Sequence, residues 1–219
     1  QVANGVYHDN LIIDRGIDLI GENQAKTLID APQSGAAIYI TAHNTTIKGF
    51  TIRSNGQATG LLLTDSLDSK ISENTMTANQ CGISLQNSNN TQITNNKIAN
   101  NTIGIQITLN SNNNGIYHNS FINNRQQIQI DPNSNNKWDN SFEEGNYWND
   151  YSGIDQNGDG IGDTMLPWQA VDNYPLLRPY VEGDVNHDGI VNIVDATILA
   201  IAWQATKGQP KYNIHADLN

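Results

Sequence analysis

Two acidic, glycine-containing stretches in the C-terminal third of the sequence have residue types and spacing that could bind a cation. The more complete one reads DVNHDGIVNIVD and occupies residues 184–195. Oxygen donors fall at positions 1, 3, 5, 7, 9 and 12, with a glycine at position 6, which is the pattern of an EF-hand-type calcium loop. The predicted ligands are Asp184, Asn186, Asp188, Ile190 through its carbonyl, Asn192 and Asp195.

The other stretch reads DQNGDGIGD and occupies residues 155–163. Its predicted ligands are Asp155, Asn157, Asp159, Ile161 through its carbonyl and Asp163. Position 12 is Leu166, so the usual last carboxylate is missing, and we expect Asp172 to supply it. The alternative is a solvated Asp/Gly turn, but carboxylates this close together repel each other unless a cation lies between them.

The pattern begins a third time at ADLN, residues 216–219, where Asp217 and Asn219 have the spacing of positions 1 and 3. The sequence therefore predicts Ca²⁺ as the cofactor, with two sites. A third site requires that another segment or another chain complete the last loop.

Charge and composition exclude several classes of protein. The net charge is -11, and the acidic excess lies in residues 139–219, opposite in sign to a nucleic-acid binder. We find no apolar run near the ~20 residues that span a membrane. The single Cys81 excludes an intrachain disulfide and is expected to be a buried small residue. Three sequons fit an extracellular or cell-surface protein, with possible glycosylation at Asn44, Asn89 and Asn100.

An internal repeat determines the expected architecture. The pattern I-x-x-N-x-apolar recurs, which aligns four asparagines: Asn74, Asn96, Asn119 and Asn140. A second series is formed by GLLL (60–63), GISL (82–85), GIQI (104–107) and QIQI (127–130). Two short strands per ~22 residues without helices predict stacked coils, with apolar columns inside and an Asn ladder at a turn.

We therefore predict an all-β fold, a right-handed parallel β-helix of about six coils, with the hand taken from the crossover rule. An antiparallel sandwich would not need so constant a period, and a leucine-rich repeat would carry helical segments. The expected organisation is a β-helix with an irregular first coil at 1–153, a calcium-loop and aromatic cap or linker at 154–181, and a small module at 182–219 with a helix over 193–205. The aromatic residues expected to cover the last coil are Tyr147, Trp148, Tyr151, Trp168 and Tyr174. The alternative is that Trp148 and Trp168 stack on sugar rings.

The stretch GDVNHDGIVNIVDATILA, followed by YNIHADLN, resembles a dockerin module, the calcium-dependent module that binds cohesin domains. A dockerin has two loop–helix repeats; here the first is complete and the second reaches only Asp217 and Asn219. The resemblance implies a cohesin-like partner, or a self partner if half-modules of two chains pair.

Residues 10–177, with the motifs GNYWNDYSGIDQNGDGIGD and VDNYPLL, resemble the NosD-like group of periplasmic and surface β-helix proteins. These belong to the carbohydrate-binding and sugar-hydrolase, or pectate-lyase-like, β-helices common in archaeal surface proteins. The resemblance implies the right-handed β-helix and an extracytoplasmic location. Its name-giving members assist copper-site assembly, but five scattered histidines and one cysteine form no copper pattern here.

The sequence predicts that the protein is not an enzyme. A glycosidase needs two carboxylates a few ångströms apart, whereas acids within the coils are few: Asp65, Asp68, Glu73 and Asp131. The expected function is a secreted, non-catalytic β-helix whose calcium-dependent C-terminal module mediates protein–protein assembly on the cell surface. Two alternatives stay open: a structural subunit of a self-assembling surface layer, sheath or filament, and a polysaccharide-binding or polysaccharide-active β-helix delivered by a dockerin. Partners expected are a cohesin-like or self partner and surface glycans, but neither nucleic acid nor an inserted membrane.

Overall fold

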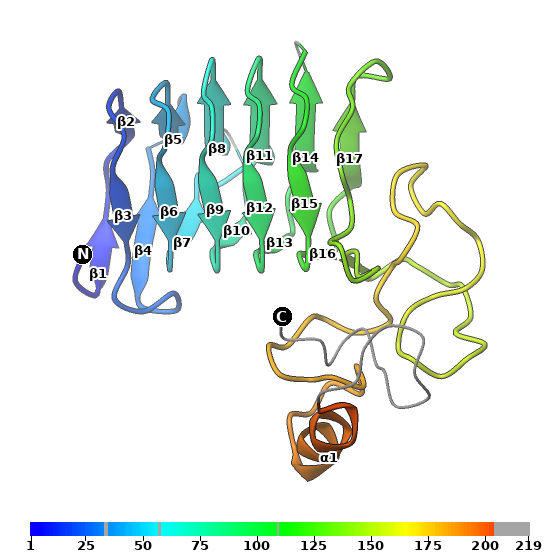
Figure 1. Cartoon of the computed structure of the whole chain (residues 1–219). Coiled ribbons are helices and arrows are strands. Elements are labelled where there is room, and N and C mark those ends of the chain that lie inside the picture. The colour runs from blue at the N-terminus through cyan, green and yellow to red at the C-terminus, as the bar shows by residue number, and fades with distance from the viewer. Residues whose placement is uncertain (33–34, 57, 109, 204–219) are drawn as a thin grey trace.

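The computed structural model describes residues 1–32, 35–56, 58–108 and 110–203. In these ranges the chain winds into a stack of parallel coils, followed by irregular loops and a C-terminal helix (Figure 1). The helix, α1 (Ile193–Ala202), lies within the predicted range 193–205, whose last two residues lie outside the described part.

Three parallel sheets run along the stack, and each coil contributes a strand to each sheet in turn. The seven-stranded sheet contains β1 (Gly5–Tyr7), β4 (Thr27–Asp30), β7 (Thr51–Arg53), β10 (Thr75–Thr77), β13 (Lys97–Ala99), β16 (Ser120–Ile122) and β18 (Tyr147–Trp148). The six-stranded sheet contains β2 (Leu11–Ile13), β5 (Ala36–Ile40), β8 (Thr59–Thr64), β11 (Cys81–Gln86), β14 (Ile103–Thr108) and β17 (Gln126–Ile130). The five-stranded sheet contains β3 (Asp18–Ile20), β6 (Thr46–Lys48), β9 (Lys70–Ser72), β12 (Gln92–Thr94) and β15 (Gly115–Tyr117). The predicted parallel β-solenoid of about six coils is confirmed.

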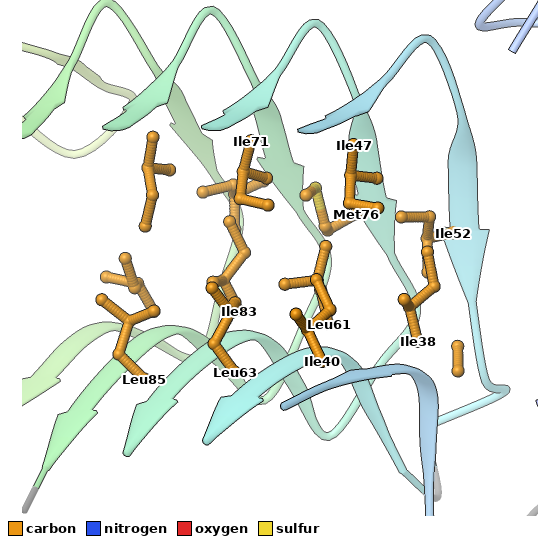
Figure 2. Packing of buried hydrophobic residues seen from close by; sticks show 14 of the residues in the cluster. Ile38, Ile40, Ile47, Ile52, Leu61, Leu63, Ile71, Met76, Ile83 and Leu85 are labelled. Carbon is orange, nitrogen blue, oxygen red and sulfur yellow. The ribbon is translucent and has the colours of Figure 1, made fainter. Parts of the chain in front are cut away.

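The apolar residues of successive coils lie above one another and fill the interior. Ile83 pairs with Leu61 on one side and Ile105 on the other, and all three side chains are fully buried. Figure 2 shows such columns between the sheets, including Ile47 beside Ile71. Because one coil alone cannot bury its apolar face, the period of ~22 residues predicts stacking rather than isolated hairpins.

The prediction of two strands per coil is wrong, because the structure has three. The I-x-x-N-x-apolar pattern around Asn74, which supplied one of the two expected strands, is divided between β9 and β10. The chain turns a corner between them, where Glu73 has φ 54° and the equivalent residues Asn95 and His118 have φ 57° and 59°. A residue in the left-handed region ends an extended strand, and the short strand on each side then joins a different sheet.

The predicted asparagine ladder is present at this corner. The side-chain Nδ2 of Asn74 donates to Oδ1 of Asn96, and that of Asn96 donates to Oδ1 of Asn119, at 3.2 and 3.0 Å. The next rung is Asn146 at 3.0 Å rather than the predicted Asn140. The last turn contains extra residues, and Asn140 instead accepts the backbone N–H of Glu144 within it.

A second ladder, which the sequence analysis missed, runs along another corner of the solenoid. Nδ2 of Asn79 donates to Oδ1 of Asn101, and Nδ2 of Asn101 donates to Oδ1 of Asn124, both at 3.0 Å. The spacings of 22 and 23 residues match those of the first ladder, so the same alignment could have revealed it.

Aromatic residues pack at the last coil. Trp148 is 1% exposed and stacks on Phe121 with ring centroids 4.2 Å apart, and Trp138 packs beside it. Tyr151 and Trp168 form an edge-to-face pair further out. The burial of Trp148 excludes the alternative that this ring stacks on a sugar.

Candidate functional site

The loop at 184–195 folds into a ring in which carboxylates accept hydrogen bonds from the loop's own backbone. Asp184 accepts N–H groups of Asp188 and Gly189 at 3.1 and 2.7 Å. The carboxylate of Asp195 returns to the start of the loop, where it accepts the N–H of Val185 at 2.8 Å. These contacts bring together positions 1, 5 and 12 of the predicted calcium loop. All three positions supply ligands in an EF-hand.

The same loop leads directly into α1. Asn192 is the N-cap: its Oδ1 accepts the N–H of Val194 at 2.7 Å, while Asp195 accepts the N–H of Asn192 at 2.8 Å. This capping box satisfies N–H groups that the first helical turn leaves free. Hydrogen bonds from Asn192 and Val185 hold the pKa of Asp195 below its usual range. The remaining predicted ligands, Asn186 and Ile190, lie in the same ring.

The loop at 155–163 has the same turns but closes earlier. Asp155 accepts the N–H groups of Gly158 and Gly160 at 2.6 and 2.9 Å, and Asp159 accepts that of Ile161 at 2.9 Å. Asp163 accepts the N–H of Gln156, next to the first position, at 2.7 Å. Asp163 therefore has the place in this loop that Asp195 has in the other, and the loop closes after nine residues. Asn157 lies within the same ring, where its Nδ2 donates to Asp159.

The structure does not bring Asp172 to this loop. Its carboxylate is fully buried under the aromatic cap, where Oδ2 accepts Trp148 Nε1 and the N–H of Asn146 at 2.8 and 2.9 Å. Oδ1 accepts the N–H of Tyr174 at 2.9 Å. The place of Asp172 as a substitute ligand is thus corrected: Asp163 closes the loop, and Asp172 holds the cap on the last coil.

The buried Asp172 should make stability depend on pH. Burial raises the pKa of Asp172 to about 6, although hydrogen bonds from Trp148 and Asn146 oppose the rise. The folded protein then binds this proton more tightly than the unfolded chain, where the pKa of Asp is about 3.9. The contribution of this group to the free energy of unfolding is therefore present below about pH 4 and lost towards pH 6, by up to about 3 kcal/mol.

The variant Asp172→Asn cannot titrate and serves as the reference for this prediction. Urea denaturation in chelator at several pH values should show the wild-type free energy of unfolding falling relative to that of the variant between pH 4 and 6. A difference that stays constant with pH would contradict the prediction.

A buried carboxylate links the last coil to the loop at 184–195. Glu144 is 7% exposed, and its Oε2 lies 2.8 Å from Nε2 of His118 while its Oε1 lies 3.0 Å from Nε2 of His187. Burial lowers the pKa of His187, but the net shift is upward, because Glu144 and the Asp159 carbonyl accept hydrogen bonds from its ring nitrogens. Sequence reasoning missed this cluster, because its contacts span 26 and 43 residues and no spacing rule connects them.

The predicted glycosylation positions differ in their surroundings. Asn44 and Asn100 are exposed on turns with φ 53° and 57°. Asn89 is half-buried, and its Oδ1 accepts the N–H of Asn112 at 2.7 Å. Asp217 and Asn219, the incomplete third loop, lie outside the described residues.

The oxygen donors of the two acidic loops suit some metal ions better than others. Among the described residues, no group of three or more His, Cys, Asp or Glu side chains is arranged to hold a metal ion. A cation in either loop would therefore draw on amide and backbone carbonyl oxygens as well as carboxylates, which suits hard cations such as calcium.

The described residues do not fit a copper site, for which soft sulfur or several imidazole ligands are expected. Cys81 is buried, which raises the pKa of its thiol to about 12. His118 and His187 both contact Glu144. His8 and His43 lie exposed on the surface of the solenoid.

Comparison with known proteins agrees with the fold. Within the described part of the chain, no helix has both the length and the apolar character needed to cross a membrane. None of the curated proteins matches the sequence. A protein-family model described as periplasmic copper-binding protein (NosD) matches residues 3–153, which contain all three sheets. Because this match covers more than half of the sequence, the chain belongs to the NosD family.

Proposed function

We propose that this NosD-family protein is a non-catalytic extracytoplasmic β-solenoid whose C-terminal loops bind calcium and mediate protein–protein assembly at the cell surface. The observation that carries the proposal is that two loop carboxylates with little exposed surface have no Lys or Arg partner. Asp184 and Asp195 are 6% and 2% exposed, and in the part of the chain that the structure describes neither pairs with Lys or Arg. Buried charges are normally paired or coordinate a metal.

Calcium is the cation that best suits these loops. Ca²⁺ takes six to eight oxygen ligands in a flexible arrangement, and each loop offers Asp and Asn side chains with a main-chain carbonyl at the position after the glycine. The loop carboxylates repel each other when no cation is bound. Calcium would therefore both order the loops and neutralise much of the acidic excess in this region.

A calcium titration of the full chain tests the proposal. Isothermal titration calorimetry should give two calcium ions per chain, and Asp188→Ala should reduce the number to one, because Asp188 is the third side-chain ligand of its loop. The control Asp65→Asn removes one exposed carboxylate from a solenoid turn that tolerates Asn at φ 54°, and should leave two. An unchanged number in Asp188→Ala would exclude this loop as a calcium site.

Self-assembly into a layer, sheath or filament is the second candidate, favoured by the exposed apolar surface of the last module. Ile193 is 77% exposed and Ile201 56%, and Trp203 at the end of α1 is 71% exposed. Light scattering coupled to size exclusion, in calcium and in chelator, separates the candidates. Oligomers that require calcium would favour a self partner, whereas monomers in both conditions would favour a different, cohesin-like partner.

A glycan-binding role is favoured by one hollow on the solenoid surface. A cleft of about 780 Å³ lies beside β15 and is lined by polar and aromatic side chains, among them Gln92, Tyr117, Lys137, Asp139 and Phe142. Asp139 is the one carboxylate among the residues lining this cleft, whereas glycoside hydrolysis needs a pair. Tyr117→Ala should weaken retention on a glycan array if the cleft binds sugars.

A further inference from the structure

We infer that the loops at 155–163 and 184–195 form one paired cation unit, clamped to the last coil by Glu144, in which filling either loop strengthens the other. The inference rests on the proposed function, because it requires that both loops bind calcium. It adds that the two sites are coupled and that calcium fixes the position of α1 relative to the solenoid.

The two loops are in direct contact through His187. This residue lies between two predicted ligands of its own loop, and its Nδ1 is 2.9 Å from the backbone carbonyl oxygen of Asp159, a predicted ligand of the other loop. Gly160, which follows Asp159, lets the backbones of the two loops approach each other. A Cβ on Gly160 would be 2.3 Å from Cβ of His187. A movement of ligands in one loop is therefore transmitted to a ligand residue of the other.

The other ring nitrogen of His187 joins this pair of loops to the solenoid. Nε2 of His187 contacts Glu144, and the second oxygen of Glu144 contacts His118 at the corner between β15 and β16. Asn140 Nδ2 also donates to Glu144 Oε2, at 2.6 Å. Glu144 is thus held from both sides, with the last coil on one side and the second loop on the other.

A second contact crosses the same junction. The ring of Tyr180, from the segment that leads into the second loop, stacks on His118 with centroids 3.6 Å apart and planes within 7°. His118 also forms an edge-to-face pair with the Tyr117 ring. Together, Tyr180 and His187 hold both the entry and the middle of the second loop against one corner of the last coil.

Coupling follows because the junction requires both loops in one arrangement. A loop emptied of calcium is free to open as its carboxylates repel, which moves the Asp159 carbonyl away from His187 or His187 away from Glu144. Calcium binding at the other loop must then first restore this His187 contact, which weakens that binding. Typical couplings of this kind change affinity by roughly 5–150-fold.

A double-mutant cycle on the full chain, with Ca²⁺ as the probe in calorimetry, tests the coupling. Asp188→Ala removes a ligand from the loop at 184–195 and should weaken calcium binding at the loop at 155–163 at least about fivefold relative to the wild type. His187→Ala leaves every predicted ligand in place, so two ions should still bind, but in this background Asp188→Ala should no longer affect the first loop. His8→Ala, which removes an exposed imidazole on the solenoid, is the control and should preserve the coupling.

The clamp has its own variant and readout. Glu144→Gln keeps the size of the side chain but removes the charge shared by the two histidines. In the wild type, calcium should slow amide exchange at Gly145 and in 178–182, whereas in Glu144→Gln it should slow exchange within the loops only. His187→Gln, which retains one hydrogen-bonding group, provides a second test if Glu144→Gln does not fold.

The outcomes separate the inference from the function on which it rests. If two ions bind independently and Asp188→Ala does not change calcium affinity at the loop at 155–163, the coupling is wrong but the proposed calcium function is not. Equal protection of 178–182 by calcium in wild type and Glu144→Gln would overturn the clamp. No calcium binding by the wild type would overturn both the inference and the proposed function.

Discussion

Replacing Trp148 with alanine is expected to lower the free energy of unfolding by about 3–5 kcal/mol, the usual cost of removing a buried tryptophan. The ring is 1% exposed and stacks on Phe121 in the last complete coil. Its Nε1 donates to the buried Asp172 at 2.8 Å, so the variant also deprives a buried carboxylate of a donor. For a chain of this size the melting temperature should fall by roughly 10 °C.

Two further variants separate the causes of this effect. Trp148→Phe keeps an aromatic ring against Phe121 but lacks the donor to Asp172, so it should recover more than half of the lost stability. Trp203→Ala removes a ring that is 71% exposed and should change stability by less than about 0.5 kcal/mol. Thermal unfolding followed by circular dichroism provides the measurement, and equal melting temperatures for Trp148→Ala and Trp203→Ala would contradict the account of the cap.

Replacing Asn96 with alanine is expected to lower the free energy of unfolding by about 3–6 kcal/mol, because several buried groups lose their partners at about 1–3 kcal/mol each. Asn96 Oδ1 accepts both the backbone N–H and the side-chain Nδ2 of Asn74, at 3.0 and 3.2 Å. Its own Nδ2 donates to Ile71 O and Asn119 Oδ1 at 2.8 and 3.0 Å. The loss interrupts the ladder in the middle of the solenoid.

The neighbouring Asn95 gives a matched control. It is exposed at the same corner with φ 57°, a conformation that glycine also adopts freely. Asn95→Gly should therefore change the urea midpoint little, whereas Asn96→Ala should lower it strongly. If both variants unfold at the same urea concentration, the ladder does not stabilise the coils as the hydrogen bonds indicate.

The repeat predicted the solenoid well, because every coil must stack on its neighbours to bury its apolar face. Asn74, Asn96 and Asn119 were placed correctly, since a residue that must bond its equivalents above and below recurs at the period of the coil. The fourth rung was misplaced at Asn140, because the last turn is longer and alignment by pattern does not measure the length of a turn. Asn146 takes that rung.

Contacts between distant segments could not be read from spacing. Asp172 was assigned to a calcium loop because it is the next carboxylate along the chain, yet the cap folds it inward onto Trp148. The contacts of Glu144 with His118 and His187 depend on how the acidic loops fold back on the last coil. Local patterns predict each loop, but only the tertiary fold brings them to one junction.

Amide hydrogen exchange of the full chain, in calcium and in chelator, tests the central claim most directly. We expect calcium to slow exchange at least about tenfold at the loop amides bonded to Asp155, Asp184 and Asp195, because local opening must then release the ion. The interior strands β8, β11 and β14 should exchange equally slowly in both conditions and serve as the internal reference. Loops that exchange at the same rate with and without calcium would contradict the account of a calcium-ordered C-terminal region on a stable solenoid.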